Sequence, residues 1–421
     1  MKGNDGPAKS YDVGKLQELR VESGEGEVYV TLESGSAEVF GAEIHTGQQV
    51  RLTGQKVAVF TWTGCRVTVN GSPSVIYLAE ETPMVSYLNL SHHLDERRQE
   101  AKAAGGQGPR VVVLGPMDSG KSTLVRMLAN WAARKGWQPM VVDVDVGQGS
   151  LTVPGCVAAT PIEQPIDIEE GYQLEAPLVY FFGHASPGDN PDYYRYLIDR
   201  LSSILDRRCE LDPAAGSSGM IINTFGWVDG PGYDLQRHVI QAFKADVIIV
   251  MEQDRLFSQL SADLKGSSPP VTLLKLTKSG GVVKREKEER RQARDSRIKE
   301  YFYGHNDKLK PNTDNARTEQ LVVYRATPGS RAPNSALPMG ASSSADPLRI
   351  THVPVNAELV QSLMAVSHAG TPDGIVSMNV AGFILVKDVD SARGIVTYVS
   401  PCSGSVPGRY LLTGSLRSAI D

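Results

Sequence analysis

The segment Arg110–Trp131 constrains the fold of this chain more than any other stretch. Val111–Leu114 is a short run of β-branched and aliphatic residues, which is typical of a strand buried on both faces. Gly115–Ser122 then matches the phosphate-binding pattern G-x-x-x-x-G-K-S without a mismatch. Apolar residues recur at helical spacing from Leu124 onward, and Gly136 follows as a helix stop. The sequence therefore predicts a strand, a phosphate loop and a helix in direct succession.

This order of elements suits the binding of a nucleoside triphosphate. Glycines let backbone N–H groups surround a phosphate, and the helix N-terminus adds the positive end of its dipole. We expect Lys121 to reach the β- and γ-phosphates and the hydroxyl of Ser122 to bind Mg²⁺. A glycine-rich turn that binds nothing is the alternative, and the complete context of the motif disfavours it.

Composition sets limits on the class of protein. A chain of 421 residues is expected to form two or three domains, and 41% hydrophobic with 22% charged residues is typical of a soluble globular protein. A net charge of −5 gives no overall attraction to nucleic acid, so a polyanion would have to bind local basic clusters. The 4 cysteines form no CxxC pair, which argues against a zinc site and favours a reducing compartment. No apolar run approaches the ~20 residues that span a bilayer, and no signal peptide is evident, so an intracellular protein without membrane contact is expected.

The N-terminal part of the chain differs in pattern from the phosphate-loop region. Between residues 16 and 90, short alternating segments are separated by turn signals such as Asn70-Gly71. This pattern predicts a small antiparallel β-sandwich or barrel. The charged segment Ser91–Ala104 has a helical pattern and is interpreted as a linker, so the first domain is expected to cover residues 1–104.

The remaining chain is predicted to form two further domains. Strands and helices alternate over residues 105–308, which predicts a P-loop domain with a parallel, doubly wound sheet. Residues 309–421 return to short strands with one apolar helical stretch, Asn356–Ser367, and are expected to form a small α/β domain. The predicted fold class is therefore α/β, with a central P-loop domain flanked by a β-sandwich and a small α/β domain.

Two acids end the strand that follows the phosphate-loop helix. Asp143 and Asp145 lie on one face of the segment Met140–Asp145. In phosphate-loop enzymes such an acid holds Mg²⁺ or accepts a proton from the nucleophile. Asp145 is preferred as the functional acid because it is nearer the C-terminal end of the strand. Asp143 is either a support residue or a second metal contact.

An aromatic loop follows another predicted strand at the same sheet edge. Trp227, in the segment Thr224–Trp227, is placed where its ring could stack on a base. Composition alone favours the alternative that Trp227 only packs under a loop.

A basic segment near the end of the central domain, at about residues 278–303, has the pattern of a lid. Gly280-Gly281 would act as its hinge, and a mixed-charge helix follows. Such helices are most often solvated, but arginines on one face could also stabilise the γ-phosphoryl group during its transfer. The candidate arginines are Arg290, Arg291, Arg294 and Arg297.

Taken together, these motifs resemble one known family. The matching stretches are GPMDSGKST (Gly115–Thr123), DVDVGQGS (Asp143–Ser150), YFFGHASPGDN (Tyr180–Asn190), INTFGWV (Ile222–Val228) and RIKEYFYG (Arg297–Gly304). In sequence, order and separation they are similar to the RNA 5′-hydroxyl kinases that are subunits of the pre-mRNA 3′-end cleavage machinery. The resemblance covers nearly the whole chain and implies three domains in the order given above.

The resemblance also implies an activity and its partners. It implies transfer of the γ-phosphoryl group of ATP, with Mg²⁺, to the 5′-hydroxyl of RNA. It further implies a nuclear protein that associates with other subunits of the mRNA 3′-end cleavage complex and with tRNA splicing endonuclease.

Roles for individual residues follow from the same resemblance. Lys121, Asp145 as general base and the four lid arginines would act in catalysis, with Ser122 and Asp145 at the metal. Gln148, Thr224, Gly226 and Trp227 would hold the 5′-terminal nucleotide. The residues implied in ATP binding are Glu18, Lys56, Gly115, Asp118, Ser119, Gly120, Lys121, Ser122 and Thr123.

Two functions remain open at this level. The first is an active kinase, which the intact loop, acid, aromatic loop and lid favour. The second is a catalytically silent, ATP-bound scaffold of the pre-mRNA cleavage complex, which would need the same phosphate loop. A nucleotide-switch GTPase is disfavoured because the sequence has no Asn-Lys-x-Asp segment to read a guanine base.

Overall fold

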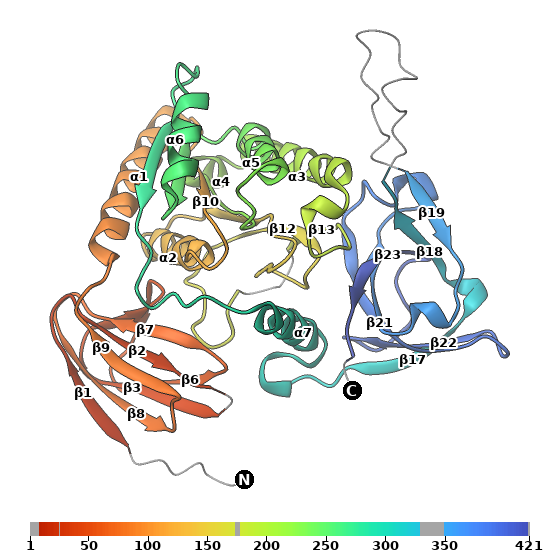
Figure 1. Ribbon diagram of the computed structural model, residues 1–421, viewed down its shortest axis with the longest axis horizontal. Helices are drawn as coiled ribbons and strands as arrows, with labels where there is room; N and C mark the ends of the chain where they lie inside the picture. Colours follow the sequence, from red (N-terminus) through yellow and green to blue (C-terminus); the bar gives the residue numbers. More distant parts are fainter. Residues whose placement is uncertain (1–7, 25, 173–176, 329–348, 420–421) are drawn as a thin grey trace.

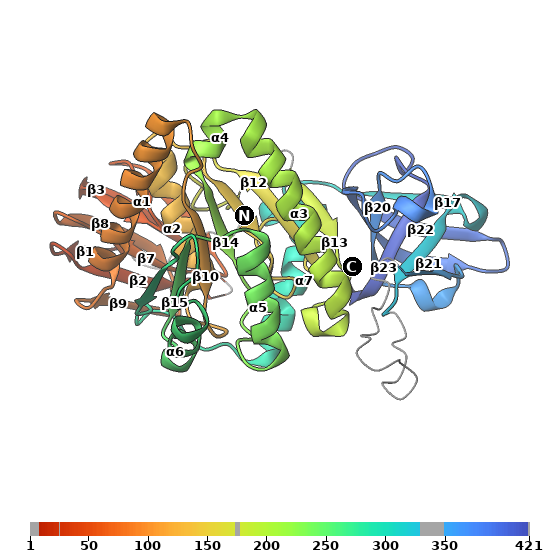
Figure 2. The same ribbon diagram turned by 90° about the horizontal axis from the view of Figure 1, so that it is seen from above.

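Three lobes, each built on β-sheet, follow one another along the longest axis of the molecule (Figure 1). The computed structural model describes residues 8–24, 26–172, 177–328 and 349–419. A β lobe at each end flanks a central α/β lobe, and the view from above shows the same order (Figure 2). In these described ranges, no helix combines the length and apolar character needed to cross a bilayer.

The N-terminal lobe is the predicted antiparallel sandwich. One sheet has the strand order β1-β8-β3-β6 and the other β5-β4-β7-β2-β9. Alternate residues such as Val28 and Val30 point inward, and one hydrophobic core joins the two sheets. The strands are β1 (Lys9–Val13), β2 (Glu18–Glu22), β3 (Glu27–Gly35), β4 (Ala37–Val39), β5 (Ala42–Ile44), β6 (Gln49–Thr53), β7 (Lys56–Phe60), β8 (Cys65–Gly71) and β9 (Val75–Ala79).

The central lobe contains a seven-stranded sheet of order β13-β12-β11-β14-β10-β15-β16. The predicted parallel sheet contains one exception, the strand β12, which was not predicted from the sequence and runs antiparallel to both β11 and β13. No helix separates β11 from β12 in the chain, so β12 folds directly back, whereas a parallel pair needs a longer crossover. The strands are β10 (Arg110–Leu114), β11 (Met140–Asp143), β12 (Cys156–Pro161), β13 (Leu178–Phe181), β14 (Met220–Asn223), β15 (Val247–Met251) and β16 (Thr272–Leu276).

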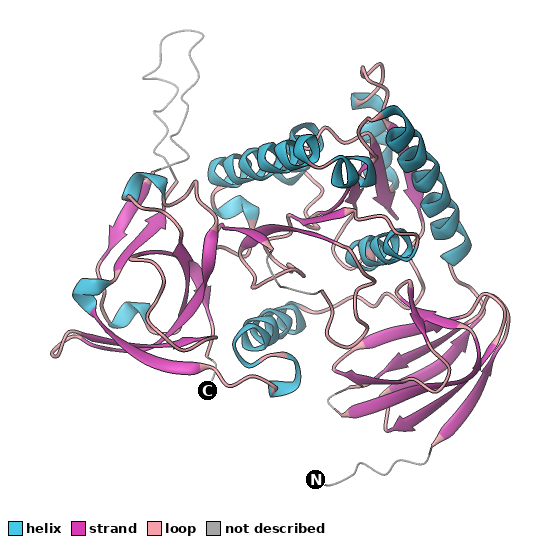
Figure 3. Ribbon diagram, turned by 180° about the vertical axis from the view of Figure 1, so that it is seen from behind, coloured by secondary structure: helices cyan, strands magenta, loops and turns pink. Residues whose placement is uncertain are grey.

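Helices cover both faces of this sheet, with α1 and α2 on one side and α3 and α5 on the other (Figures 2 and 3). The segment predicted as a linker, Ser91–Ala104, is the C-terminal part of α1. Leu90 and Leu94 on α1 are buried in the core of the central lobe, so this helix packs as part of that lobe. The helices are α1 (Met84–Ala104), α2 (Lys121–Arg134), α3 (Pro191–Leu211), α4 (Pro213–Ser218), α5 (Pro231–Ala242), α6 (Asp254–Asp263) and α7 (Lys287–Tyr303).

The C-terminal lobe is a second seven-stranded sheet, of order β17-β22-β21-β20-β23-β18-β19. The predicted helix at Asn356–Ser367 is wrong: a 3-10 turn at Ala357–Leu359 leads into β20, and every residue of β20 is buried. An apolar run buried on both faces does not distinguish helix from strand, and here pairing with β21 and β23 decides. The strands are β17 (Asn312–Arg317), β18 (Val322–Ala326), β19 (Ile350–Val353), β20 (Ser362–Ser367), β21 (Val380–Asp390), β22 (Ile395–Ser400) and β23 (Tyr410–Arg417).

The C-terminal lobe contacts the central lobe next to β13 and α7. The Phe383 ring lies edge-on to the rings of Phe181 and Tyr301, with centroids 5.8 and 5.4 Å away. Gly414 of β23 approaches Gly183 so closely that a Cβ on Gly414 would lie 1.8 Å from the carbonyl oxygen of Gly183. The lobe is therefore packed tightly against the loop that follows β13.

Candidate active site

A cavity of about 890 Å³ lies where the N-terminal lobe, the phosphate loop and the lid segment meet. We call it the interlobe cavity, and its volume is within the range of small-molecule sites. The predicted site residues that line it are Glu18, Lys56, Asp118, Ser119, Gly120, Lys121, Ser122, Thr123, Asp145, Gln148, Gly226 and Arg290. Six others lie outside its lining, namely Gly115, Thr224, Trp227, Arg291, Arg294 and Arg297.

The phosphate loop connects β10 to the first turn of α2. Gly120 caps this helix in a left-handed conformation with φ 85°, and no side chain caps the helix N-terminus. The Nζ of Lys121 donates hydrogen bonds to the carbonyl oxygens of Gly115 (2.9 Å) and Pro116 (2.7 Å). Burial lowers the pKa of Lys121 to about 8. The loop therefore places a buried amine and free backbone N–H groups at the cavity wall, which suits an anion.

The two acids after β11 have different environments. Asp143 is buried and accepts hydrogen bonds from the backbone N–H (2.6 Å) and hydroxyl (2.7 Å) of Ser150. It also accepts the side-chain amide of Asn223 at 3.0 Å and the N–H of Asp145 at 3.1 Å. The carboxylate oxygens of Asp143 thus accept hydrogen bonds from the protein itself, and these bonds support the loop that follows β11.

Asp145 faces the interlobe cavity. Its Oδ1 accepts the backbone N–H groups of Gly147 (2.9 Å) and Gln148 (3.1 Å). Burial by the surrounding loop and the neighbouring charge of Asp143 raise the pKa of Asp145 to about 6. A carboxylate with this pKa, held by two N–H groups beside a cavity, can accept a proton near neutral pH.

The oxygen atoms near Ser122 fit a magnesium ion. The Ser122 hydroxyl donates to Oδ1 of Asn223 at 3.3 Å, and both Ser122 and Asp145 line the cavity. Mg²⁺ prefers oxygen ligands and usually keeps several waters or substrate phosphates in its shell. Over the described residues, no cluster of three or more His, Cys, Asp or Glu side chains could hold a metal. The oxygen donors of the protein that would hold such an ion are those of Ser122 and Asp145.

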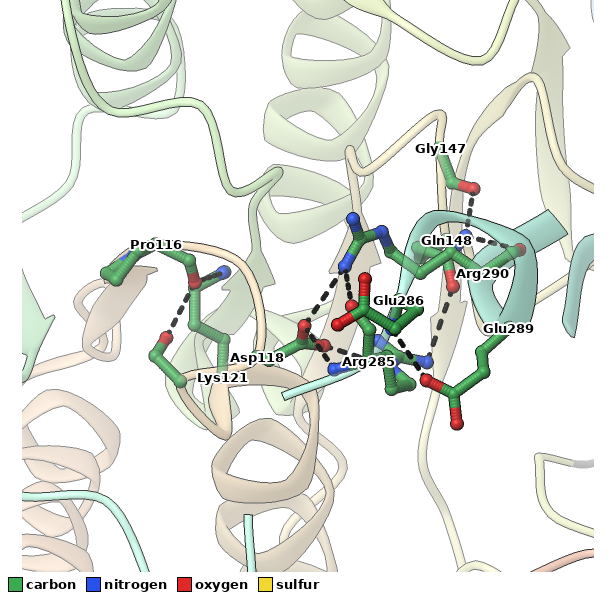
Figure 4. A network of polar contacts seen from close by, with 10 residues as sticks. Pro116, Asp118, Lys121, Gly147, Gln148, Arg285, Glu286, Glu289 and Arg290 are labelled. Carbon is green, nitrogen blue, oxygen red and sulfur yellow. Dashed lines mark hydrogen bonds and ion pairs between the residues drawn. The ribbon is translucent and has the colours of Figure 1, made fainter. Parts of the chain in front are cut away.

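The N-terminal end of the lid segment lies against the phosphate loop (Figure 4). Asp118 pairs with Arg285 Nε at 2.8 Å and with Arg290 Nη1 at 3.2 Å. Gln148 contacts both arginines, since its Oε1 accepts from Arg285 Nη1 (3.4 Å) and its Nε2 donates to the carbonyl of Arg290 (3.2 Å). Arg285 and Arg290 both line the cavity, so the structure closes the lid over the phosphate end.

Only one of the four predicted lid arginines reaches this cavity. Arg291 is exposed, and Arg297 is turned toward Glu300 (2.6 Å) and the carbonyl of Ser150 (2.8 Å). Arg285 was missed by the sequence analysis. The mixed-charge segment predicted as a helix runs from Lys284 to Glu300, whereas α7 begins at Lys287. Arg285 therefore precedes the helix, and arguments about helical faces do not apply to it. The sequence signal that could have pointed to Arg285 was its position shortly after the predicted hinge Gly280-Gly281.

The loop after β14 supports the phosphate loop from the side. Thr224 is fully buried, and its hydroxyl donates to the carbonyl of Val113 at 2.7 Å, so it fastens this loop to β10. A Cβ at Gly226 would lie 2.4 Å from Cγ and 2.5 Å from the backbone nitrogen of Met117. Only glycine allows this approach.

Trp227 lies outside the lining of the interlobe cavity and keeps 38% of its surface exposed. A Cβ added to Gly188 would lie 3.0 Å from Cζ3 and 3.5 Å from Cη2 of the Trp227 ring, so the ring packs against the loop that follows β13. The structure therefore joins two predicted motifs, Tyr180–Asn190 and Ile222–Val228, at one sheet edge.

The opposite end of the cavity belongs to the N-terminal lobe. Glu18 accepts from Arg20 Nε at 2.6 Å and from the Thr82 hydroxyl at 3.0 Å. Lys56 pairs with Glu22 at 3.1 Å. Both predicted contacts, Glu18 and Lys56, thus come to the cavity wall from neighbouring strands β2 and β7.

Three family descriptions match consecutive parts of the chain. Residues 12–101 match "N-terminal beta-sandwich domain of polyadenylation factor". Residues 115–304 match "mRNA cleavage and polyadenylation factor CLP1 P-loop", and residues 309–418 match "Pre-mRNA cleavage complex II protein Clp1".

Relatives of known name are similar over almost the whole chain. The "Protein CLP1 homolog" of Arabidopsis thaliana is 44% identical over 418 residues, covering 97% of this chain and 94% of that protein. The "Polyribonucleotide 5'-hydroxyl-kinase Clp1" of Homo sapiens is 40% identical over 414 residues, covering 98% of this chain and 96% of that protein.

A solved structure has the same fold. It is described as the wild-type Clp1p-Pcf11p (454–563) complex, with a TM-score of 0.84 at 22% identity over 99% of both chains. The order of the lobes, the phosphate loop at the interlobe cavity and the extent of the sequence matches lead to one conclusion. This chain belongs to the CLP1 family of mRNA cleavage and polyadenylation factors.

Proposed function

We propose that this protein is an ATP-dependent polynucleotide 5′-hydroxyl kinase that transfers the γ-phosphoryl group of ATP to the 5′-hydroxyl of RNA. One observation carries the proposal: Lys121, Asp145 and the lid arginines Arg285 and Arg290 line the same cavity. These side chains supply phosphate binding, proton acceptance and cationic stabilisation in one place. The curated human and chicken relatives, 40% and 41% identical, carry the name polyribonucleotide 5'-hydroxyl-kinase.

Binding of ATP uses both walls of the cavity. The backbone N–H groups of the phosphate loop and Lys121 hold the phosphates, and this would release Lys121 from the carbonyls of Gly115 and Pro116. Glu18 and Lys56 contact the adenosine from the N-terminal lobe. Mg²⁺, when bound near Ser122 and Asp145, would neutralise charge on the phosphate oxygens.

The transfer step uses Asp145 and the lid. Asp145 orients the 5′-hydroxyl and accepts its proton as the oxygen attacks the γ-phosphorus, while the bond from the γ-phosphorus to the β–γ bridging oxygen breaks and ADP leaves. Arg285 and Arg290 donate hydrogen bonds to the γ-phosphoryl oxygens as charge spreads over them, and Lys121 remains on the phosphates. Losing one such contact typically costs about 2.7–4 kcal/mol of barrier, or about 10²–10³ in rate.

The RNA end lies at the rim formed by the loops after β13 and β14. Trp227 stacks on the first base, while Thr224 and Gly226 set the loop that carries it. We further propose that the protein works in the nucleus with other subunits of the mRNA 3′-end cleavage complex and with tRNA splicing endonuclease. The solved relative in complex with Pcf11p supports the first of these partnerships.

The proposal is tested by steady-state label transfer. The purified protein is incubated with γ-labelled ATP, Mg²⁺ and matched RNA and DNA oligonucleotides that carry 5′-hydroxyl ends. We expect label on the RNA, a lower rate on DNA, and loss of transfer in Lys121→Ala. Transfer by Lys121→Ala at the wild-type rate would contradict the proposal.

A further inference from the structure

The phosphate loop contains an aspartate whose backbone conformation is unusual. Asp118 has φ 54°, in the left-handed region that residues other than glycine, asparagine and aspartate seldom adopt. Its side chain is only 5% exposed although it lies on a loop. The backbone therefore fixes the direction of this carboxylate, which points at the lid (Figure 4).

Both oxygens of the Asp118 carboxylate are taken by the lid segment. Oδ1 accepts from Nε of Arg285 at 2.8 Å, and Oδ2 accepts from the backbone N–H of Arg285 at 3.0 Å. Oδ2 also accepts from Nη1 of Arg290 at 3.2 Å. Partial burial raises the pKa of Asp118, but these hydrogen bonds and the two positive charges outweigh burial and lower it. The carboxylate is thus held ionised between two guanidinium groups.

These contacts leave part of each guanidinium group for a ligand. Across the described residues, the hydrogen bonds of Arg285 and Arg290 do not use Nη2 of either side chain. Glu289, which precedes Arg290, accepts the backbone N–H of Glu286 in the capping box of α7 and also lines the cavity. Arg285, Arg290 and Asp118 together carry one net positive charge, and the acids Asp145 and Glu289 line the same cavity.

The far end of the lid helix is fixed independently. The hydroxyl of Tyr301 accepts the backbone N–H of Phe383 in the C-terminal lobe at 3.1 Å. Ile298 and Phe302 are buried in the central core. The C-terminal turns of α7 are therefore anchored, and Asp118 is the acid that ties its N-terminal end to the phosphate loop.

We propose that Asp118 is a positioning residue that holds Arg285 and Arg290 over the γ-phosphoryl position and couples closure of the lid to occupation of the phosphate loop. When the lid opens, an unpaired carboxylate remains beside the phosphates and repels them. When the lid closes, the same carboxylate is neutralised and aims the free N–H groups at the transferring group. The catalytic part of this inference rests on the proposed kinase function, whereas the contact between loop and lid does not.

The test compares Asp118→Asn with the wild-type protein. Asparagine tolerates the same backbone conformation, so the loop keeps its shape while the negative charge is lost. Asp254→Asn is the matched control, because Asp254 is 83% exposed in its side chain and pairs with Lys275 on the surface. Two readouts are taken: kcat and KM for ATP in RNA phosphorylation, and amide hydrogen exchange of the peptide 284–295 without nucleotide.

For Asp118→Asn we expect kcat to fall about 10- to 100-fold while KM for ATP changes less than about threefold, because positioning of the arginines is lost and not the phosphate contacts themselves. Exchange in 284–295 should accelerate at least about fivefold, since the loop no longer holds the lid. Asp254→Asn should match the wild type in both readouts.

Wild-type kcat in Asp118→Asn, or unchanged exchange in the lid peptide, would overturn the inference. Should the wild type fail to phosphorylate RNA, the proposed function fails and exchange alone decides on the loop–lid contact. The variant Arg285→Ala removes the side-chain contact of Arg285 with Asp118 and leaves the contact of Arg290. It should accelerate exchange in the same peptide, and the double variant should exchange more slowly than the sum of the two single effects predicts.

Discussion

The ionisation of Asp145 should set the pH dependence of RNA phosphorylation. Burial and the charge of Asp143 raise the pKa of Asp145 to about 6, and only its ionised form can accept a proton. Such an acid is about nine-tenths ionised at pH 7 and about one-tenth ionised at pH 5. Because the pKa is raised, activity should be lost as pH falls through about 6, well above the range of an ordinary aspartate.

The assay is kcat/KM for a 5′-hydroxyl RNA oligonucleotide between pH 5 and 8 at constant ionic strength, since this ratio reports ionisation of the free enzyme. We expect a roughly tenfold decrease from pH 7 to pH 5. In Asp145→Asn, loss of the proton acceptor should lower the rate about 10²- to 10⁴-fold and remove the inflection. Asp254→Asn should keep both rate and inflection.

Two results would refute this reasoning. A wild-type profile that is flat from pH 5 to 7 would show that Asp145 does not titrate there or is not the base. An inflection near pH 6 that persists in Asp145→Asn would assign the titration to another group.

Three further changes test the site. Gly226→Ala should displace Met117 and reduce transfer, and the overpacking should lower the free energy of unfolding by about 1–3 kcal/mol and with it the Tm. An unchanged Tm would contradict the close approach of Gly226 to Met117. The pKa of Lys121 is about 8, so its amine is mostly neutral at pH 9 and should take up nearly one proton when the phosphates of ATP bind. Calorimetry should show this uptake as a binding enthalpy that depends on the buffer at pH 9 but not at pH 6.5. Trp227→Ala should raise KM for RNA about 5- to 150-fold and leave KM for ATP unchanged; the opposite pattern would place the ring at the nucleotide.

The phosphate loop and the strands around it were predictable because local sequence determines them. A buried parallel strand reads as a continuous apolar run, and the predicted strand Val111–Leu114 lies within β10, every residue of which is buried. The glycines of the loop allow the positive φ angles of its tight backbone path, so the residues around Lys121 meet at the cavity as the motif required.

Features that depend on contacts distant in sequence were not predictable in the same way. The strand β20 was predicted as helix, because its burial comes from neighbouring strands that lie elsewhere in the chain. The role of Arg285 depends on Asp118, 167 residues away, and on the position at which α7 begins. Reversal of β12 likewise follows from a connection without a helix, which an apolar pattern does not reveal.

The central claim is that this cavity transfers the γ-phosphoryl group and does not merely retain ATP. The most direct measurement loads the protein with γ-labelled ATP and Mg²⁺, removes free nucleotide, and then adds 5′-hydroxyl RNA with excess unlabelled ATP in a single-turnover quench. Our account predicts that bound label moves to the RNA 5′ end, and that Asp145→Asn retains it as ATP. Label that stays in bound ATP, with the wild-type protein and intact RNA, would contradict the account and favour an ATP-bound scaffold.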